Sequence, residues 1–164
     1  MTKNNIYLVV SWGLVIIWML IIFAFSAVNG EDSTSSSINM ISKTVEITSN
    51  VLYKVRIIKK PLSRERINEI ADALNKPVRK TMHMGEYFIL TILLYNALFI
   101  SKVKRINILG FLIALLYSIT DEFHQLFTMR TGSIIDVLID SIGIVLALGF
   151  IYIFKKSHVK VKVF

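Results

Sequence analysis

The chain has 164 residues, enough for one domain, and 54% of them are hydrophobic, with a mean hydropathy of +0.62. The apolar residues come in long blocks, which indicates an integral membrane protein and argues against a soluble domain. The absence of cysteine excludes disulfides, thiol catalysis and cysteine-ligated metals. The net charge of +8 fits lysines and arginines that flank membrane spans and meet anionic lipid headgroups, so we expect membrane lipids and no nucleic acid as partners.

The first predicted element is a transmembrane helix over 6–28, a stretch of 23 residues without a charged side chain. At about 1.5 Å per residue, this helix crosses the ~30 Å hydrocarbon layer. The alternative is a cleaved signal peptide, because Ala24, Ser26 and Ala27 resemble a small-residue cleavage site. However, the apolar run exceeds the usual signal core of about 7–15 residues, so we assign residues 1–28 to a first span.

Residues 29–78 are polar and contain no predicted span. The stretch 30–37, GEDSTSSS, predicts a turn and a source of helix N-caps, and apolar residues at helical spacing then predict a helix over about 37–58. A second short helix is predicted over 64–74, with its end at Pro77, because a proline disfavours helical geometry in the residue before it. This amphipathic helical loop either lies on the membrane surface, covers the polar residues described below as a lid, or is a solvated connector.

Three more spans are predicted over 83–100, 106–127 and 133–154. The turns between them, 101–105 and 128–132, are short, so neighbouring spans run antiparallel. Gly143 and Gly149 in the last span are expected to allow close helix packing. The predicted fold is therefore all-α, an integral membrane four-helix bundle with a helical loop between its first and second spans.

The distribution of basic residues favours a multi-pass protein of the cell membrane with both termini in the cytoplasm. In that topology the cytoplasmic side holds Lys3, three basic residues in 101–105 and four in the tail 155–164, whereas the short outer turn holds only Arg130. The basic loop 29–78 argues the other way, but the positive-inside rule gives little weight to loops of that length.

Polar side chains collect at the outer ends of spans two, three and four in this topology. Most are three or four residues apart within a helix, which places them on shared faces: His83 and Glu86, then Asp121, Glu122, His124 and Gln125, then Asp136 and Asp140, with Arg130 in the last turn. Asp121 and Asp140 each lie about 9–10 Å from the ends of their spans. Because a charge at a helix centre costs roughly 2.5–3.5 kcal/mol on insertion scales, we predict that these residues form one site.

Three motifs then form a recognisable set: Arg79-Lys80-x-x-His83-x-x-Glu86-Tyr87, Asp121-Glu122-x-His124-Gln125-x-Phe127, and Arg130 with Asp136, Asp140 and Gly143. Together they resemble the VanZ-like family of membrane proteins, over about 79–148, within a three-span core at 79–154. Any one motif alone is weak, but the combination is specific. The resemblance implies a four-helix topology, a place in the bacterial cell envelope and a link to teicoplanin resistance.

The first functional hypothesis is a site that binds or acts on a phosphate-bearing envelope lipid or a lipid-linked cell-wall precursor. Glu122, Asp121 and His83 are the candidate catalytic groups, because carboxylates and imidazoles transfer protons. The candidate substrate-binding residues are Arg130, Arg79, Glu86, Gln125, Asp136 and Asp140. A divalent cation is a possible cofactor, since oxygen-rich ligand sets suit Mg²⁺, Mn²⁺ or Ca²⁺.

Two other interpretations stay open. In one, the cluster is a structural network that fixes helix packing, because polar groups within lipid must be paired. In the other, the carboxylates relay an ion or proton. The inner halves of the spans have few polar residues, chiefly Asn96 and Asn107, which disfavours transport.

Overall fold

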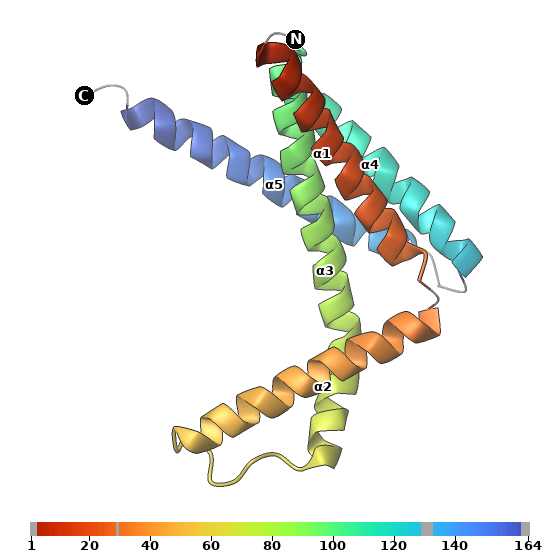
Figure 1. Ribbon diagram of the computed structural model, residues 1–164, viewed down its shortest axis with the longest axis vertical. Coiled ribbons are helices and arrows are strands. Elements are labelled where there is room, and N and C mark those ends of the chain that lie inside the picture. The colour runs from red at the N-terminus through yellow and green to blue at the C-terminus, as the bar shows by residue number, and fades with distance from the viewer. Residues whose placement is uncertain (1–2, 29, 129–132, 162–164) are drawn as a thin grey trace. The chain divides into compact units, whose positions relative to one another are not determined.

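The structure is a computed structural model that describes residues 3–28, 30–128 and 133–161, and within these ranges it contains helices and no strand. In chain order the elements are α1 (Lys3–Ser26), α2 (Gly30–Lys54), α3 (Arg64–Ile100), α4 (Ile106–Gln125), the short 3₁₀ helix η1 (Leu126–Thr128) and α5 (Ile134–Val161) (Figure 1). The predicted all-α fold is confirmed. The chain divides into two compact units, Met1–Ala27 with Met82–Phe164 (the membrane unit) and Val28–Thr81 (the α2 unit).

Four helices are long and apolar enough to cross a membrane, over Asn4–Ser26, Arg64–Ile100, Ile106–Gln125 and Ile134–Lys156. This confirms the four predicted spans. Large apolar side chains such as Leu20, Phe123 and Leu138 are exposed on the outer faces of these helices. Exposed aliphatic and aromatic groups are stable on such faces when the surrounding medium is hydrocarbon.

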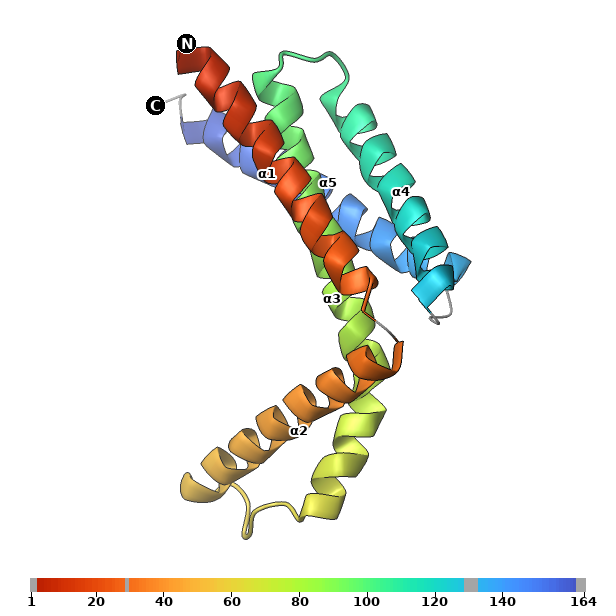
Figure 2. The same cartoon turned by 45° about the vertical axis from the view of Figure 1, so that its right-hand side comes forward.

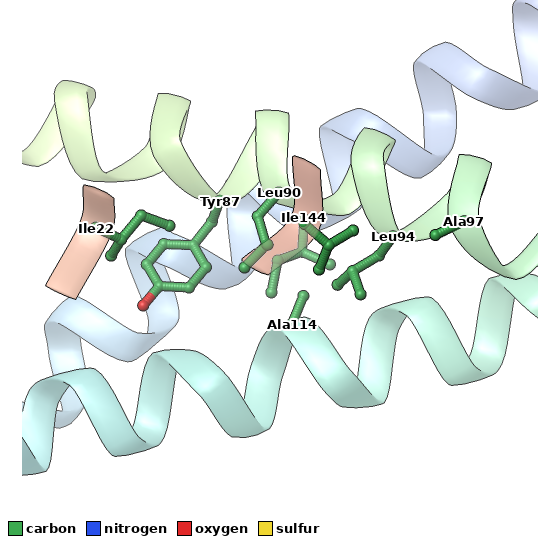
Figure 3. Close-up of a cluster of buried hydrophobic side chains, with 8 residues drawn as sticks. Ile22, Tyr87, Leu90, Leu94, Ala97, Ala114 and Ile144 are labelled. Atoms are coloured by element: carbon green, nitrogen blue, oxygen red, sulfur yellow. The ribbon is translucent and has the colours of Figure 1, made fainter. Parts of the chain in front are cut away.

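All four membrane helices contribute to one apolar core in the membrane unit. Figure 3 shows Ile22 of α1, four residues of α3, Ala114 of α4 and Ile144 of α5 around a common centre, all fully buried. The α3 residues Tyr87, Leu90, Leu94 and Ala97 recur every three or four positions, which makes one continuous face. On α4, small residues at positions 110, 114 and 118 let the neighbouring helix approach closely.

Hydrogen bonds from aromatic side chains attach α1 to its neighbours. The indole of Trp18 donates to the Glu86 carbonyl oxygen at 3.0 Å, and the Tyr117 hydroxyl donates to the Met19 carbonyl oxygen at 2.6 Å. In the N-terminal half of α1, the Trp12 indole donates to Oγ of Ser101, the residue directly after α3, at 3.0 Å. These residues therefore have a polar role beyond apolar packing, which composition alone does not reveal.

Gly143 of α5 lies directly against the backbone of α3 at Met84. A β-carbon there would collide with the carbonyl group of Met84, so only glycine fits. Gly149 has no atom within 4 Å of the equivalent position. The predicted packing role is confirmed for Gly143, and it is wrong for Gly149.

Two boundaries predicted near the second helix of the chain are wrong. The stretch 30–37 is the start of α2 and not a turn, and α2 ends at Lys54. Helix α2 begins at Gly30, so the whole of the stretch GEDSTSSS has helical backbone. A helix start is thus as compatible with GEDSTSSS as a turn.

The helix predicted to end at Pro77 continues to Ile100 as α3. A proline inside a helix removes one backbone hydrogen bond and costs about 3 kcal/mol. Here long helical stretches on both sides offset that cost, and the Thr81 hydroxyl donates to the Pro77 carbonyl oxygen at 2.9 Å. The boundary between the two units falls directly after Thr81.

The α2 unit pairs α2 with the first half of α3. Ile41, Ile67 and Ala71 are buried in this unit. An ion pair joins Arg64 to Glu46 at 2.8 Å, and the Leu62 N–H donates to Ser49 Oγ at 2.8 Å. A polar groove of about 640 Å³ runs between the two helices and is lined by Ile38, Asn39, Ser42, Lys43, Glu46, Arg64, Asn68 and Asp72.

We predict that Gly143→Ala destabilises the membrane unit by about 1–3 kcal/mol, since the added methyl group forces α5 away from α3. The apparent Tm in detergent, followed by circular dichroism, should fall. Gly149→Ala is the matched control, because the site is open and alanine raises helix propensity by up to about 1 kcal/mol. Equal Tm values for the two variants would contradict the close contact.

Candidate functional site

The centre of the candidate site is one face of the last two turns of α4. Ser118, Asp121, Glu122 and Gln125 are all buried there, at spacings of three and four residues. The Gln125 amide donates to Asp121 Oδ2 at 3.2 Å and to Glu122 Oε1 at 3.0 Å. One neutral side chain therefore joins two adjacent acids, as the predicted spacing required.

Hydrogen bonds extend this face to α5. The Ser118 hydroxyl donates to Asp140 Oδ2 at 2.6 Å, and the Ser133 backbone N–H donates to Glu122 Oε2 at 3.0 Å. Ser133 directly precedes α5, so Glu122 lies at the helix N-terminus, where the dipole favours negative charge. The Asp140 side chain is only 1% exposed, so this carboxyl group is enclosed by protein and has almost no contact with solvent or lipid.

Four carboxylates share this site. Asp140 interacts electrostatically with Glu122, Asp121 and Asp136, and Glu122 interacts with Asp136 and Asp121. The convergence predicted for these acids and Gln125 is therefore present in the structure. The end of α1, the end of α4 and the start of α5 lie at the same end of the membrane unit (Figures 1 and 2).

Tyr87 joins the cluster from the apolar core of α3. Its side chain is fully buried, and Figure 3 shows its hydroxyl directed away from α3. Asp121, Asp140 and Glu86 all act electrostatically on that hydroxyl. Within the described part of the chain it has no hydrogen-bond partner. Tyr87 thus brings a polar atom to the acids and connects them to the side of α3 that carries Glu86.

His83 and Glu86 form a pair one helical turn apart on α3. His83 Nδ1 lies 3.4 Å from Glu86 Oε2, and both side chains are largely buried. His124 behaves differently, because its ring packs against Phe23 of α1 with centroids 4.3 Å apart. The predicted pairing of His83 with Glu86 is present, whereas His124 faces α1 and not the Gln125 side of α4.

The two predicted arginines are not placed at the cluster. Arg79 belongs to the α2 unit, where its guanidinium donates to Thr34 Oγ1 at 3.3 Å. Arg130 lies outside the described residues. A role for either arginine at the acidic cluster stays a prediction.

Two carboxylate oxygens in the cluster have unused hydrogen-bonding capacity. Asp121 Oδ1 and Asp140 Oδ1 are buried and have no partner among the described residues. Among these same residues, no group of three or more histidine, aspartate or glutamate side chains is arranged to hold a metal ion. A divalent cation at this site would therefore need ligands beyond the acids, such as phosphate oxygens or water.

Sequence reasoning missed Tyr87 and Ser118 as site residues. Ser118 is three residues before Asp121, so helical spacing places it on the same face and could have identified it. Tyr87 ends the first family motif, but its residue type did not mark it as a site residue, because a tyrosine beside an apolar run is most simply a packing group. Only the position of α3 against α4 directs its hydroxyl to the acids.

Comparison with known protein families identifies the chain. The family described as VanZ/LLP1 matches residues 11–155. The chain belongs to the VanZ/LLP1 family. The predicted resemblance is confirmed, and the match covers a longer segment than the motifs alone indicated. No curated protein and no solved structure matches this VanZ/LLP1 chain significantly.

We predict that Ser118→Ala destabilises this VanZ/LLP1 protein by about 1–2 kcal/mol, because it removes the donor to Asp140 Oδ2. Hydrogen bonds to charged groups contribute about 1.5–3 kcal/mol in soluble proteins, and interhelical bonds in membranes average about 0.6. The measurement is chemical unfolding in mixed micelles. Thr120→Ala is the control, since its exposed hydroxyl bonds only within its own helix. A loss equal to that of the control would mean that Asp140 does not depend on Ser118.

Proposed function

We propose that this VanZ/LLP1 membrane protein binds a phosphate-bearing envelope lipid or lipid-linked cell-wall precursor at its acidic cluster, and that this binding contributes to tolerance of glycopeptides such as teicoplanin. The observation that supports the proposal is the pair of buried oxygens, Asp121 Oδ1 and Asp140 Oδ1, that lack a partner in the described chain. A buried polar atom without a partner costs free energy, so a ligand that supplies one is bound favourably.

The charge of the cluster determines what kind of ligand fits. Four carboxylates at low dielectric repel one another and require a cation or protons. A divalent cation held by Asp121 and Asp140 has open coordination positions, which the oxygens of a lipid phosphate fill. The phosphate and the cation therefore bind together, each supplying the charge that the other needs. Arg130, three residues before Ser133 in the sequence, would supply a guanidinium for a bidentate contact to the same phosphate.

The distribution of charge in the membrane unit supports an outward-facing site. The acids lie at one end of the helices, and Lys102, Lys104 and Arg105 occupy the turn at the other end of α4. Lys155 of α5 lies over the Tyr95 ring of α3, 4.7 Å from its centroid. By the positive-inside rule the basic end faces the cytoplasm, with both termini, and the acidic end faces the outer leaflet, where envelope precursors are used.

Proton transfer at a bound phosphate would fall to three residues. Glu122 and Asp121 share the Gln125 amide, which orients both carboxylates. His83 is oriented by Glu86, as a base held by a carboxylate is in many acid–base sites. Binding alone, however, accounts for the unpartnered oxygens, and catalysis is a further step that these residues are chemically able to support.

A second candidate function is purely structural. Each of three acids already accepts a hydrogen bond within the protein, Asp140 from Ser118, Asp121 from Gln125 and Glu122 from Ser133. A network of this kind fixes the packing of α4 on α5 without any ligand. In that case substitutions in the acidic cluster lower the amount of folded protein, and neither the wild type nor the variants carry a bound ligand.

Native mass spectrometry of the detergent-purified protein separates the two candidates. We predict that the wild type retains a phosphate-bearing lipid, a divalent ion or both. In Asp121→Asn the fraction of protein that carries this ligand should fall at least tenfold. The same chemical change at the exposed Asp72, Asp72→Asn, is the control and should retain the ligand. Folded Asp121→Asn protein with undiminished ligand would refute the proposal. Low yield with no ligand in the wild type would favour the structural network.

The link to glycopeptides is tested in cells. Expression of the wild type should raise the minimal inhibitory concentration of teicoplanin several-fold over an empty vector. We expect Glu122→Gln to abolish that increase at equal membrane levels, because it removes one charge and keeps an acceptor for the Ser133 N–H. If Glu122→Gln raised the minimal inhibitory concentration as much as the wild type does, teicoplanin tolerance would not depend on the acidic cluster.

A further inference from the structure

The end of the α2 unit that carries the loop after α2 has a distinctive composition. Residues 54–60, KVRIIKK, hold four cations and three branched aliphatic residues, and no acid. We call this segment the basic–apolar tip. Val55 is 58% exposed and Ile57 is 69% exposed, so aliphatic groups and cations share one accessible surface. Exposed aliphatic groups interleaved with cations are typical of segments that lie at a membrane interface.

The backbone of the tip is a Schellman motif. The Ile57 N–H donates to the Leu52 carbonyl oxygen at 2.9 Å, and the Arg56 N–H donates to the Tyr53 carbonyl oxygen at 3.0 Å. Arg56 takes the left-handed conformation at φ 60°, a position that glycine usually occupies because a β-carbon is strained there. The chain thus carries an arginine where its backbone conformation favours glycine.

The turn after α3 has the same construction. The Val103 N–H donates to the Leu98 carbonyl oxygen at 3.1 Å, and the Lys102 N–H donates to the Phe99 carbonyl oxygen at 3.0 Å. Lys102 is left-handed, at φ 55°. In both turns a strained cation precedes a β-branched aliphatic residue. The turn at 101–105 joins two membrane spans, so its cations lie at the lipid headgroups.

We propose that the basic–apolar tip docks on an anionic phospholipid surface. Val55 and Ile57 insert at the boundary between headgroups and acyl chains, and the four cations contact lipid phosphates, as in interfacial amphipathic segments. The partner is a lipid surface because interleaved cations and aliphatic groups match the boundary between anionic headgroups and acyl chains, where both kinds of side chain are accommodated together. The same construction in a turn between two spans supports this choice. The proposal does not depend on the acidic cluster.

The test uses the full-length protein in nanodiscs. The chain has no cysteine, so Ile57→Cys provides a single attachment point for an environment-sensitive, apolar fluorophore. In discs that contain phosphatidylglycerol we expect blue-shifted emission and strong quenching by lipids brominated in the upper acyl chain. In discs of phosphatidylcholine alone both effects should weaken. Emission typical of water in both kinds of disc would overturn the proposal.

A matched pair of charge variants tests the role of the cations. Lys59→Glu with Lys60→Glu should abolish the blue shift in anionic discs. Lys43→Glu with Lys76→Glu, which makes the same change of net charge at exposed positions of α2 and α3, should retain it. Equal behaviour of the two pairs would refute the proposal. A blue shift that depends on protein concentration and not on lipid charge would show that a second copy of the chain covers the tip, which also overturns it.

Discussion

Hydrocarbon supplies no hydrogen-bond partner to a carboxylate, and the membrane unit is arranged around that constraint. Asp140 bonds to Ser118 of α4, and Glu122 bonds to the backbone just before α5. These two contacts lie at different heights along the same helix pair. A shift of α5 along α4 would break both contacts, so the polar contacts favour one register of the two helices.

The remaining contacts hold this arrangement rigid. Gly143 brings α5 against the α3 backbone at Met84, immediately before the segment that carries Glu86 and Tyr87. Hydrogen bonds from Trp18 and Tyr117 attach α1 at the same level. The acids therefore stand in a fixed frame in which certain carboxylate oxygens are satisfied and others are not. A pre-organised site loses little conformational entropy on binding, which favours the proposed binding of a cation or a phosphate.

Prediction from sequence succeeded for features that depend on local periodicity. The spacing of Asp121, Glu122 and Gln125 predicted their shared face, because an α-helix repeats every 3.6 residues. It failed at Pro77, where a local rule about proline was overridden by the helices on either side. It also failed for Tyr87, since a tyrosine hydroxyl can bond to lipid headgroups, to water or to another helix, and nothing in the neighbouring residues distinguishes these.

The sequence alone determined that the chain is an all-helical membrane protein with four helices long and apolar enough to cross a membrane, and its motifs identified the VanZ-like family. Both follow from the composition and order of residues, because burial in lipid depends on the hydrophobicity of each segment taken by itself. The tertiary structure alone decided that Ser118 supports Asp140, that Tyr87 faces the acids and that Gly143, unlike Gly149, must lack a side chain. Those assignments depend on the rotation and closest approach of helices, which are set by contacts between residues far apart in the chain.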